Sequence, residues 1–371
     1  MGRRSHATWG KPARRRRMPG PGEAPRMDMT ILLFLMQDGL TNGAVYALLG
    51  LALVLVFAVT RVIFIPQGEF VAYGGLTYAL LAAGKLPGTA WMMVWFGLAA
   101  FVVEMIARRR DLSGALLARE AGLKLVWPLL VLWLASLAAG MAPSVVVNVL
   151  LSVAIVGSLG PYLYRVAYQP IEDASVLVLL IASVGVHMAM LGLGLVFFGP
   201  EGLRADALIN ASFNLGPLLV TGQSIAVYVA TLLLIAALAL FFETSIHGKA
   251  LRATAINRVG ARLVGIRTMI AGRIAFALAA AIGAISGVLI VPATTLYYDT
   301  GFLIGLKGFV AAIIGGLVSY PVTAIAALGV GIVEAFASFH ASSYKEIIVF
   351  MLLLPILTWQ SLTHPNHDEE E

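Results

Sequence analysis

The chain has 371 residues, of which 60% are hydrophobic and only 12% are charged. Soluble domains carry about 25% charged residues, and disordered chains combine high charge with low hydrophobicity, so the composition excludes both classes. The formal net charge of +6 comes from residues 1–26, which hold eight Lys and Arg against one Glu, so no nucleic-acid partner is expected for the rest.

Residues 1–28 predict either a basic disordered leader or an overcalled translation start. The segment is rich in Arg, Pro and Gly, and it lacks the apolar core of about 7–15 residues that a secretory signal needs. A translated leader would be a basic arm that binds anionic lipid. Otherwise translation would begin at Met27 or Met29.

The apolar blocks that follow are long enough to cross a bilayer core of about 30 Å, which takes about 20 helical residues. We therefore predict an all-α, polytopic integral membrane protein with about 9–11 transmembrane helices at 29–362, followed by an acidic cytoplasmic tail at 363–371. The candidate spans are 40–60, 66–84, 89–107, 123–142, 144–163, 175–197, 219–242, 270–291, 303–318, 320–338 and 345–362. Because the block at 303–318 is short and glycine-rich, it either spans or re-enters the membrane.

The charges orient these spans. Alternating them places thirteen Lys and Arg on one face and only Lys85, Arg204 and Lys345 on the other, and the positive-inside rule makes the first face cytoplasmic. The residues before 40–60 are then external, where a basic leader would resist translocation. Either the leader is not translated, or residues 29–37 dip back into the membrane.

The longest polar stretch of the body lies at 243–273 and carries six Lys and Arg. Apolar residues recur in it at helical spacing, at Leu251, Ala255, Val259 and Leu263. The pattern predicts one short amphipathic helix on the cytoplasmic surface between Gly248 and Gly265. Such a helix either adheres to the lipid surface or docks a cytoplasmic partner, and the residues alone leave both open.

This stretch resembles the cytoplasmic coupling loop of the LivH-type permeases, the membrane subunits of branched-chain amino acid ABC importers. The resemblance rests on Gly248-Lys249-Ala250-Leu251-Arg252-Ala253-Thr254-Ala255, Asn257 and Leu263-Val264-Gly265-Ile266. Further similar motifs follow the family's order, namely Asn42-Gly43 with Tyr46-Ala47-Leu48, Gln67-Gly68-Glu69, Arg165-Val166-Ala167-Tyr168-Gln169-Pro170, and Gly305, Lys307 and Phe309 with Glu334. Together they cover roughly 37–360.

The resemblance implies an ABC importer permease that moves branched-chain or related hydrophobic amino acids by ATP-driven alternating access in the bacterial plasma (inner) membrane. The implied partners are a LivM-type second permease, two cytoplasmic ABC ATPase subunits that bind the ATP, and an external substrate-binding protein. The implied ATPase-coupling residues are Gly248, Arg252, Ala255, Asn257, Arg258 and Gly265. No enzymatic activity, cofactor or metal is expected, because the sequence lacks a phosphate-binding loop and metal-ligand spacings.

Two departures from the family leave the substrate open. Phe64 stands where the family usually has Asn, and 88–142 contains one extra hairpin. Urea or short amides are therefore an alternative substrate class. A secondary transporter or channel is the other alternative, whose signs would be ion-binding carboxylates or inverted repeats, and neither is clear in the sequence.

Polar residues at membrane depth are costly and are candidates to line the translocation path. They are Asn42, Tyr46, Gln67, Glu69, His187, Lys307 and Glu334. Most also have a structural explanation: Asn42 and Tyr46 can bridge helices, Glu69 suits a helix start, His187 suits a packed core, and Lys307 and Glu334 can neutralise each other. Glu104 is explained by an i,i+4 pair with Arg108.

Overall fold

The computed structural model describes residues 29–109, 113–141, 143–215 and 218–363, and these are mainly helical. The long helices are α1 (Met29–Thr60), α3 (Gly88–Ala107), α6 (Val145–Leu163), α7 (Val176–Phe198), α8 (Gly222–Thr244), α11 (Thr268–Ile290) and α13 (Tyr320–His340). The shorter ones are α2 (Gln67–Ala82), α4 (Gly114–Ala121), α5 (Trp127–Ala138), α9 (Ile246–Ile256), α10 (Arg258–Leu263), α12 (Thr300–Ile314), α14 (Lys345–Met351) and α15 (Leu353–Thr363). Strands β1 (Ser212–Leu215) and β2 (Leu218–Thr221) form an antiparallel hairpin.

Nine helical segments of the described chain are long and apolar enough to span a membrane, which confirms the polytopic all-α prediction. One of them is α1, which runs unbroken from Met29. The alternative in which 29–37 dips back does not agree with this helix, because no glycine or proline interrupts it before Gly39. The two alternatives for 1–28, and nearly all of the predicted tail, lie outside the described residues.

The predicted spans at 66–84 and 303–318 form short helices, as the length of 303–318 already indicated. Helix α2 has 16 residues and α12 has 15, so neither reaches the length of about 20 that crosses a bilayer. Helix α2 begins only after Pro66, because proline lacks a backbone donor and interrupts helices. Helix α12 begins before 303 but ends at Ile314, where Gly315 follows and Gly316 has a φ of 66°.

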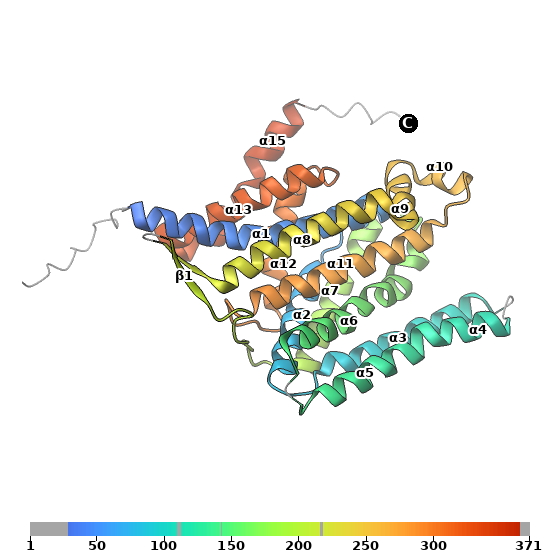
Figure 1. Ribbon diagram of the computed structural model, residues 1–371. Coiled ribbons are helices and arrows are strands. Elements are labelled where there is room, and N and C mark those ends of the chain that lie inside the picture. The colour runs from blue at the N-terminus through green and yellow to red at the C-terminus, as the bar shows by residue number, and fades with distance from the viewer. Residues whose placement is uncertain (1–28, 110–112, 142, 216–217, 364–371) are drawn as a thin grey trace, which may run out of the picture.

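Helix α1 lies at the centre of the molecule, between α11, α12 and α13 (Figure 1). In the most apolar 18-residue stretch of α1, 89% of the residues are buried, whereas in that of α8 only 11% are buried. Glycines let α1 and α13 approach closely, since a Cβ on Gly39 would lie 2.6 Å from the Ile332 Cα. The first long helix along the chain is thus the core helix.

Helices α1 and α11 run in opposite directions, and each precedes one of the two short helices. Helix α2 packs against α11 and α12 packs against α1. The two short helices meet at their first turns, where a Cβ on Gly68 would lie 2.0 Å from the Gly301 carbonyl oxygen. The pairs α1–α2 and α11–α12 therefore form an inverted arrangement, which inspection of the sequence did not reveal.

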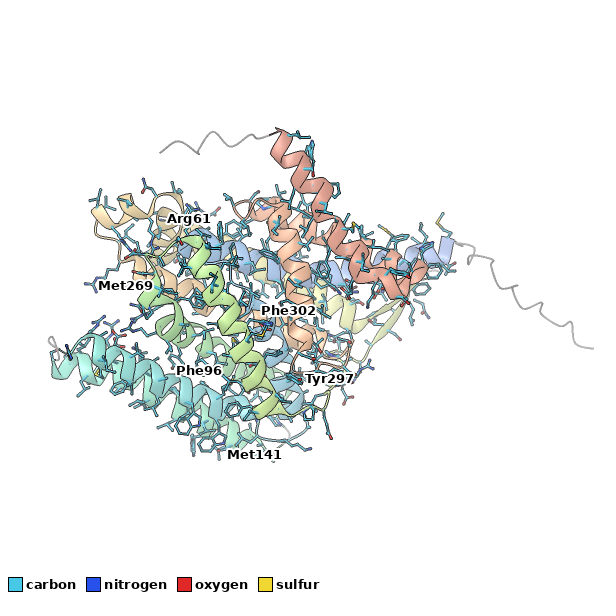
Figure 2. All side chains as sticks on the ribbon, turned by 180° about the vertical axis from the view of Figure 1, so that it is seen from behind. Arg61, Phe96, Met141, Met269, Tyr297 and Phe302 are labelled. Carbon is cyan, nitrogen blue, oxygen red and sulfur yellow. The ribbon has the colours of Figure 1, made fainter. Side chains whose placement is uncertain are left out.

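Figure 2 shows the two ends of the molecule. Arg61 and Met269 lie at one end, Tyr297 and Met141 lie toward the other, and Phe302 lies between them. We call the first the basic end, because it carries Arg61, α9 and α10, and the second the hairpin end, because it carries β1 and β2 (Figure 1). The predicted orientation makes the basic end cytoplasmic.

Candidate functional site

A cavity of about 870 Å³ lies at the hairpin end, and we call it the hairpin-end cavity. Its walls come from α1, β2, α8, the end of α11, α12, α13 and α14. Four of the seven predicted path residues line it, namely Asn42, Tyr46, Lys307 and Glu334. Elements from both halves of the chain thus place these residues around one space.

A buried ionic network occupies one wall of this cavity. The Lys307 Nζ lies 2.5 Å from Glu334 Oε1 and 3.2 Å from Glu346 Oε1. The Tyr46 hydroxyl donates a 2.6 Å hydrogen bond to Glu334 Oε2. The predicted Lys307–Glu334 pair is therefore confirmed, and Glu346 is an additional partner. Sequence reasoning missed Glu346, although an acid beside Lys345 at the start of an apolar block was a visible signal.

A third carboxylate, Asp38, lines the same cavity. It lies on α1 one turn before Asn42, and none of the ion pairs among the described residues involves it. The cavity therefore holds three carboxylates against Lys307 and Lys345. This charge balance favours the positively charged group of a solute.

Gln67, Glu69 and His187 do not line this cavity, and Glu69 and His187 instead pair near the crossing of α2 and α12. The His187 Nδ1 lies 2.7 Å from Glu69 Oε1, and the His187 ring stacks on Phe302 with centroids 4.6 Å apart. The Gln67 amide donates to the Ala279 carbonyl at 3.0 Å. Glu69 is fully buried, in the first turn of α2, where the helix dipole favours a carboxylate.

The predicted coupling segment consists of two helices, so the prediction of one amphipathic helix is wrong. Asn257 has φ −149° and ψ 102°, which ends α9, and its side chain caps α10 by accepting from the Gly260 N–H at 2.8 Å. The predicted apolar stripe therefore does not pack as one face. Leu251 is buried, whereas Val259 and Leu263 are 69% and 84% exposed.

The six predicted coupling residues all lie at the basic end, but in different surroundings. Gly248 sits at the α8–α9 corner, where a Cβ would lie 2.1 Å from the Phe241 carbonyl oxygen, and Gly265 has a φ of 85°. The Arg258 guanidinium lies 3.1 Å from Glu172 Oε2 within the same chain. Arg252 and Ala255 instead line a second cavity.

Arg262 extends the contact between α10 and the segment that follows α6. Its guanidinium lies 3.0 Å from Asp173 Oδ1 and 3.5 Å from Glu172 Oε1. Together with the Arg258 pair, these contacts tie α10 to the connection between α6 and α7. Sequence reasoning missed this connection because Glu172 and Asp173 lie far from α10 along the chain.

Glu104 is the centre of a larger ionic cluster than the predicted i,i+4 pair. The Arg108 pair is confirmed at 2.6 Å. Glu104 also contacts Lys124 at 2.8 Å, Arg165 at 2.7 Å and Arg273 at 3.0 Å. Lys124 lies between α4 and α5, Arg165 lies just after α6, and Arg273 lies on α11.

Metal binding is a separate question. Among the residues that the structure covers, no group of three acidic or histidine side chains could hold a metal ion.

Comparisons with known proteins agree with this architecture. Residues 35–357 match the family model described as branched-chain amino acid transport system / permease component. The high-affinity branched-chain amino acid transport system permease protein LivH of Escherichia coli (strain K12) is 26% identical over 347 residues, which cover 89% of this chain and 95% of the relative. The corresponding permease protein BraD of Pseudomonas aeruginosa is 26% identical over 334 residues, covering 87% of this chain and 92% of BraD. No solved structure matches significantly.

Proposed function

Because the chain belongs to the family of branched-chain amino acid transport permease components, we propose that it is one membrane subunit of an ABC importer. It is a multi-pass protein of the bacterial inner membrane. The proposed cargo is a branched-chain or related hydrophobic amino acid. The proposed partners are a LivM-type second permease, two cytoplasmic ATPase subunits that bind ATP, and an external substrate-binding protein.

The hairpin-end cavity is the observation that carries this proposal. It combines the Lys307–Glu334–Glu346 network with apolar walls such as Leu289 and Ile304. Charged groups can orient the ammonium and carboxylate of an amino acid, and apolar walls can accept its side chain. In the predicted orientation the cavity lies on the external side, where a binding protein would release its solute.

The basic end supports the coupling part of the proposal. Val259 and Leu263 expose apolar surface on α10, and Arg258 and Arg262 fasten α10 to Glu172 and Asp173. An ATPase that pushes on α10 would thus act on the α6–α7 connection as well. Alternating access would follow as rigid movement of these helices, with the solute passing from one side to the other.

Affinity purification tests the subunit composition directly. The full chain would carry a C-terminal tag in its native host, and mass spectrometry would identify proteins that co-purify in mild detergent. We expect a second permease and two ATPases that contain phosphate-binding loops. Recovery of the chain alone, with solute uptake that persists after ATP depletion, would instead support a secondary transporter or channel. Uptake of labelled leucine against labelled urea separates the two substrate classes.

A further inference from the structure

A second cavity, of about 740 Å³, lies at the basic end between α1, α8, α9 and α13, and we call it the basic-end cavity. Its walls are mainly apolar, with Leu51, Val59, Ile235, Leu238 and Leu251 among them. Charged side chains in the lining come from Arg61, Arg252 and Glu243. The cavity is therefore an apolar space with two arginines and one carboxylate.

The two arginines are free to bind an anion. None of the ion pairs among the described residues involves Arg61 or Arg252. Arg61 follows the last residue of α1 with a φ of 61°, a left-handed conformation that is uncommon outside glycine. Its guanidinium carbon lies 5.9 Å from the centroid of the Phe57 ring, another residue of the cavity wall.

The surrounding surface gives membrane lipid access to this cavity. Helix α8 forms one wall, and only 11% of the residues in its most apolar 18-residue stretch are buried. Leu232, Leu233 and Leu240 on α8 are exposed, as expected for side chains that face lipid. The arginines belong to the basic end, which the positive-inside rule places at the cytoplasmic leaflet. That leaflet is the one in which anionic headgroups attract basic side chains.

We propose that the basic-end cavity binds one anionic phospholipid of the cytoplasmic leaflet. An acyl chain lies between α1, α8 and α13, and the phosphate lies between the guanidinium groups of Arg61 and Arg252. Arginine suits a phosphate because its planar fork of donors can bind two oxygens at once. Because α9 forms part of the wall, the bound lipid also touches the segment proposed to couple to the ATPases. The proposal itself does not depend on the transported solute.

The headgroup contact is tested by measuring retained lipid. The full-length protein would be reconstituted into nanodiscs of phosphatidylcholine and phosphatidylglycerol. Native mass spectrometry would then count the lipids that stay bound to it. Arg61→Asn removes the charge, and asparagine tolerates the left-handed conformation. We expect this variant to lower retained phosphatidylglycerol about tenfold, the usual scale of one charge-assisted hydrogen bond. Arg109→Asn is the matched control, since it removes an exposed charge from the predicted cytoplasmic face outside the cavity.

The acyl-chain contact needs a second variant. Ala239 lines the cavity from α8, so Ala239→Trp fills space without changing charge. We expect it to lower retention of phosphatidylglycerol while the thermal melting temperature stays within a few degrees of the unmodified protein. Inorganic phosphate should not displace the lipid, because it lacks the apolar part. Equal lipid retention in Arg61→Asn and Arg109→Asn, or displacement by phosphate alone, would overturn the proposal.

Discussion

Lys307 shows how a single cation can hold a membrane-depth site together. It lies between Glu334 and Glu346, and its side chain is buried. Replacing it by methionine leaves the buried Glu334 carboxylate without its cation. We expect Lys307→Met to lower the free energy of unfolding by about 3–5 kcal/mol, the usual cost of removing one partner of a buried pair. A thermal melt in detergent would show this as a large downward shift.

A paired variant separates stability from transport at this site. Lys307→Met combined with Glu334→Leu removes both buried charges, and such replacements are often neutral for stability. We expect the double variant to recover most of the lost melting temperature. Leucine uptake should stay low if the network orients the solute. Normal uptake in the double variant would show that the pair has only a structural role.

The residue-level predictions were confirmed where the two partners lie close in sequence or on neighbouring helices. The Lys307–Glu334 pair followed from two unexplained charges in neighbouring helices, and the Glu104–Arg108 pair from helical spacing. The Glu69–His187 contact did not follow, because the sequence does not say that α7 packs beside α2. Long-range ion pairs depend on helix arrangement, which residue patterns leave undetermined.

At the scale of elements, the crossing of α2 and α12 depends on glycine. A Cβ on Gly68 would overlap the Gly301 carbonyl, which is backbone and cannot rotate away. We expect Gly68→Ala to cost about 1–3 kcal/mol of stability through overpacking. Gly185→Ala on α7 is the matched control, because nothing lies within 4 Å of its added Cβ. Comparable melting temperatures for both variants would contradict the close crossing.

The exposed face of α10 gives a prediction about coupling. Leu263 is 84% exposed, so changing it should leave the fold of the chain intact. We expect Leu263→Asp to reduce uptake by the assembled importer at least tenfold, about 1.4 kcal/mol of lost contact energy, while ATP hydrolysis continues. The assay compares leucine uptake and phosphate release in the same proteoliposomes. Leu263→Met keeps an apolar contact and should behave normally, whereas equal uptake by both variants would exclude α10 from the interface.

Element boundaries were predicted best where apolar runs are long and uninterrupted. The spans that correspond to α3, α7 and α13 agree closely with the structure. The boundaries of α2 and α12 were missed because α2 begins only after Pro66 and α12 ends before Gly315 and Gly316. The break at Asn257 was missed because an amphipathic repeat continues across it, although asparagine is a favoured cap.

At the scale of the whole molecule, Glu104 joins four parts of the chain. Its carboxylate contacts cations at the end of α3, between α4 and α5, just after α6 and on α11. We expect Glu104→Gln to destabilise the protein by about 3–5 kcal/mol, because the buried Lys124 and Arg165 lose their shared anion. Hydrogen exchange should rise most in 114–138. Glu120→Gln is the control, since among the ion pairs of the described residues Glu120 contacts only Lys124, so its loss should cost less.

The orientation of the molecule in the membrane is also testable, because the chain contains no cysteine. A single cysteine at Asn210 or at Lys249 would therefore be the only thiol. We expect a membrane-impermeant maleimide added to intact cells to label Asn210→Cys and to leave Lys249→Cys unlabelled until the cells are opened. The reverse pattern would invert the orientation that the charge distribution predicts.

The fold class followed from composition, because a chain that is 60% hydrophobic in long blocks has few soluble alternatives. The inverted arrangement of α1–α2 and α11–α12 did not follow, since the two halves show no clear similarity in sequence. The helices that pack against α1 could not be predicted from the sequence either. After Asn42 this helix is apolar on nearly every side, so it carries no periodic signal that would identify its buried face.

The central place of α1 has a consequence for biosynthesis. Its contact with α13 brings together Tyr46 and Glu334, which are 288 residues apart along the chain. At about 5–20 residues per second, the ribosome needs roughly 15–60 s to make that intervening stretch. During this interval the glycine-lined face of α1 has no α13 to cover it. A chain released before residue 320 would therefore expose its core helix, and we expect quality-control proteases to remove it.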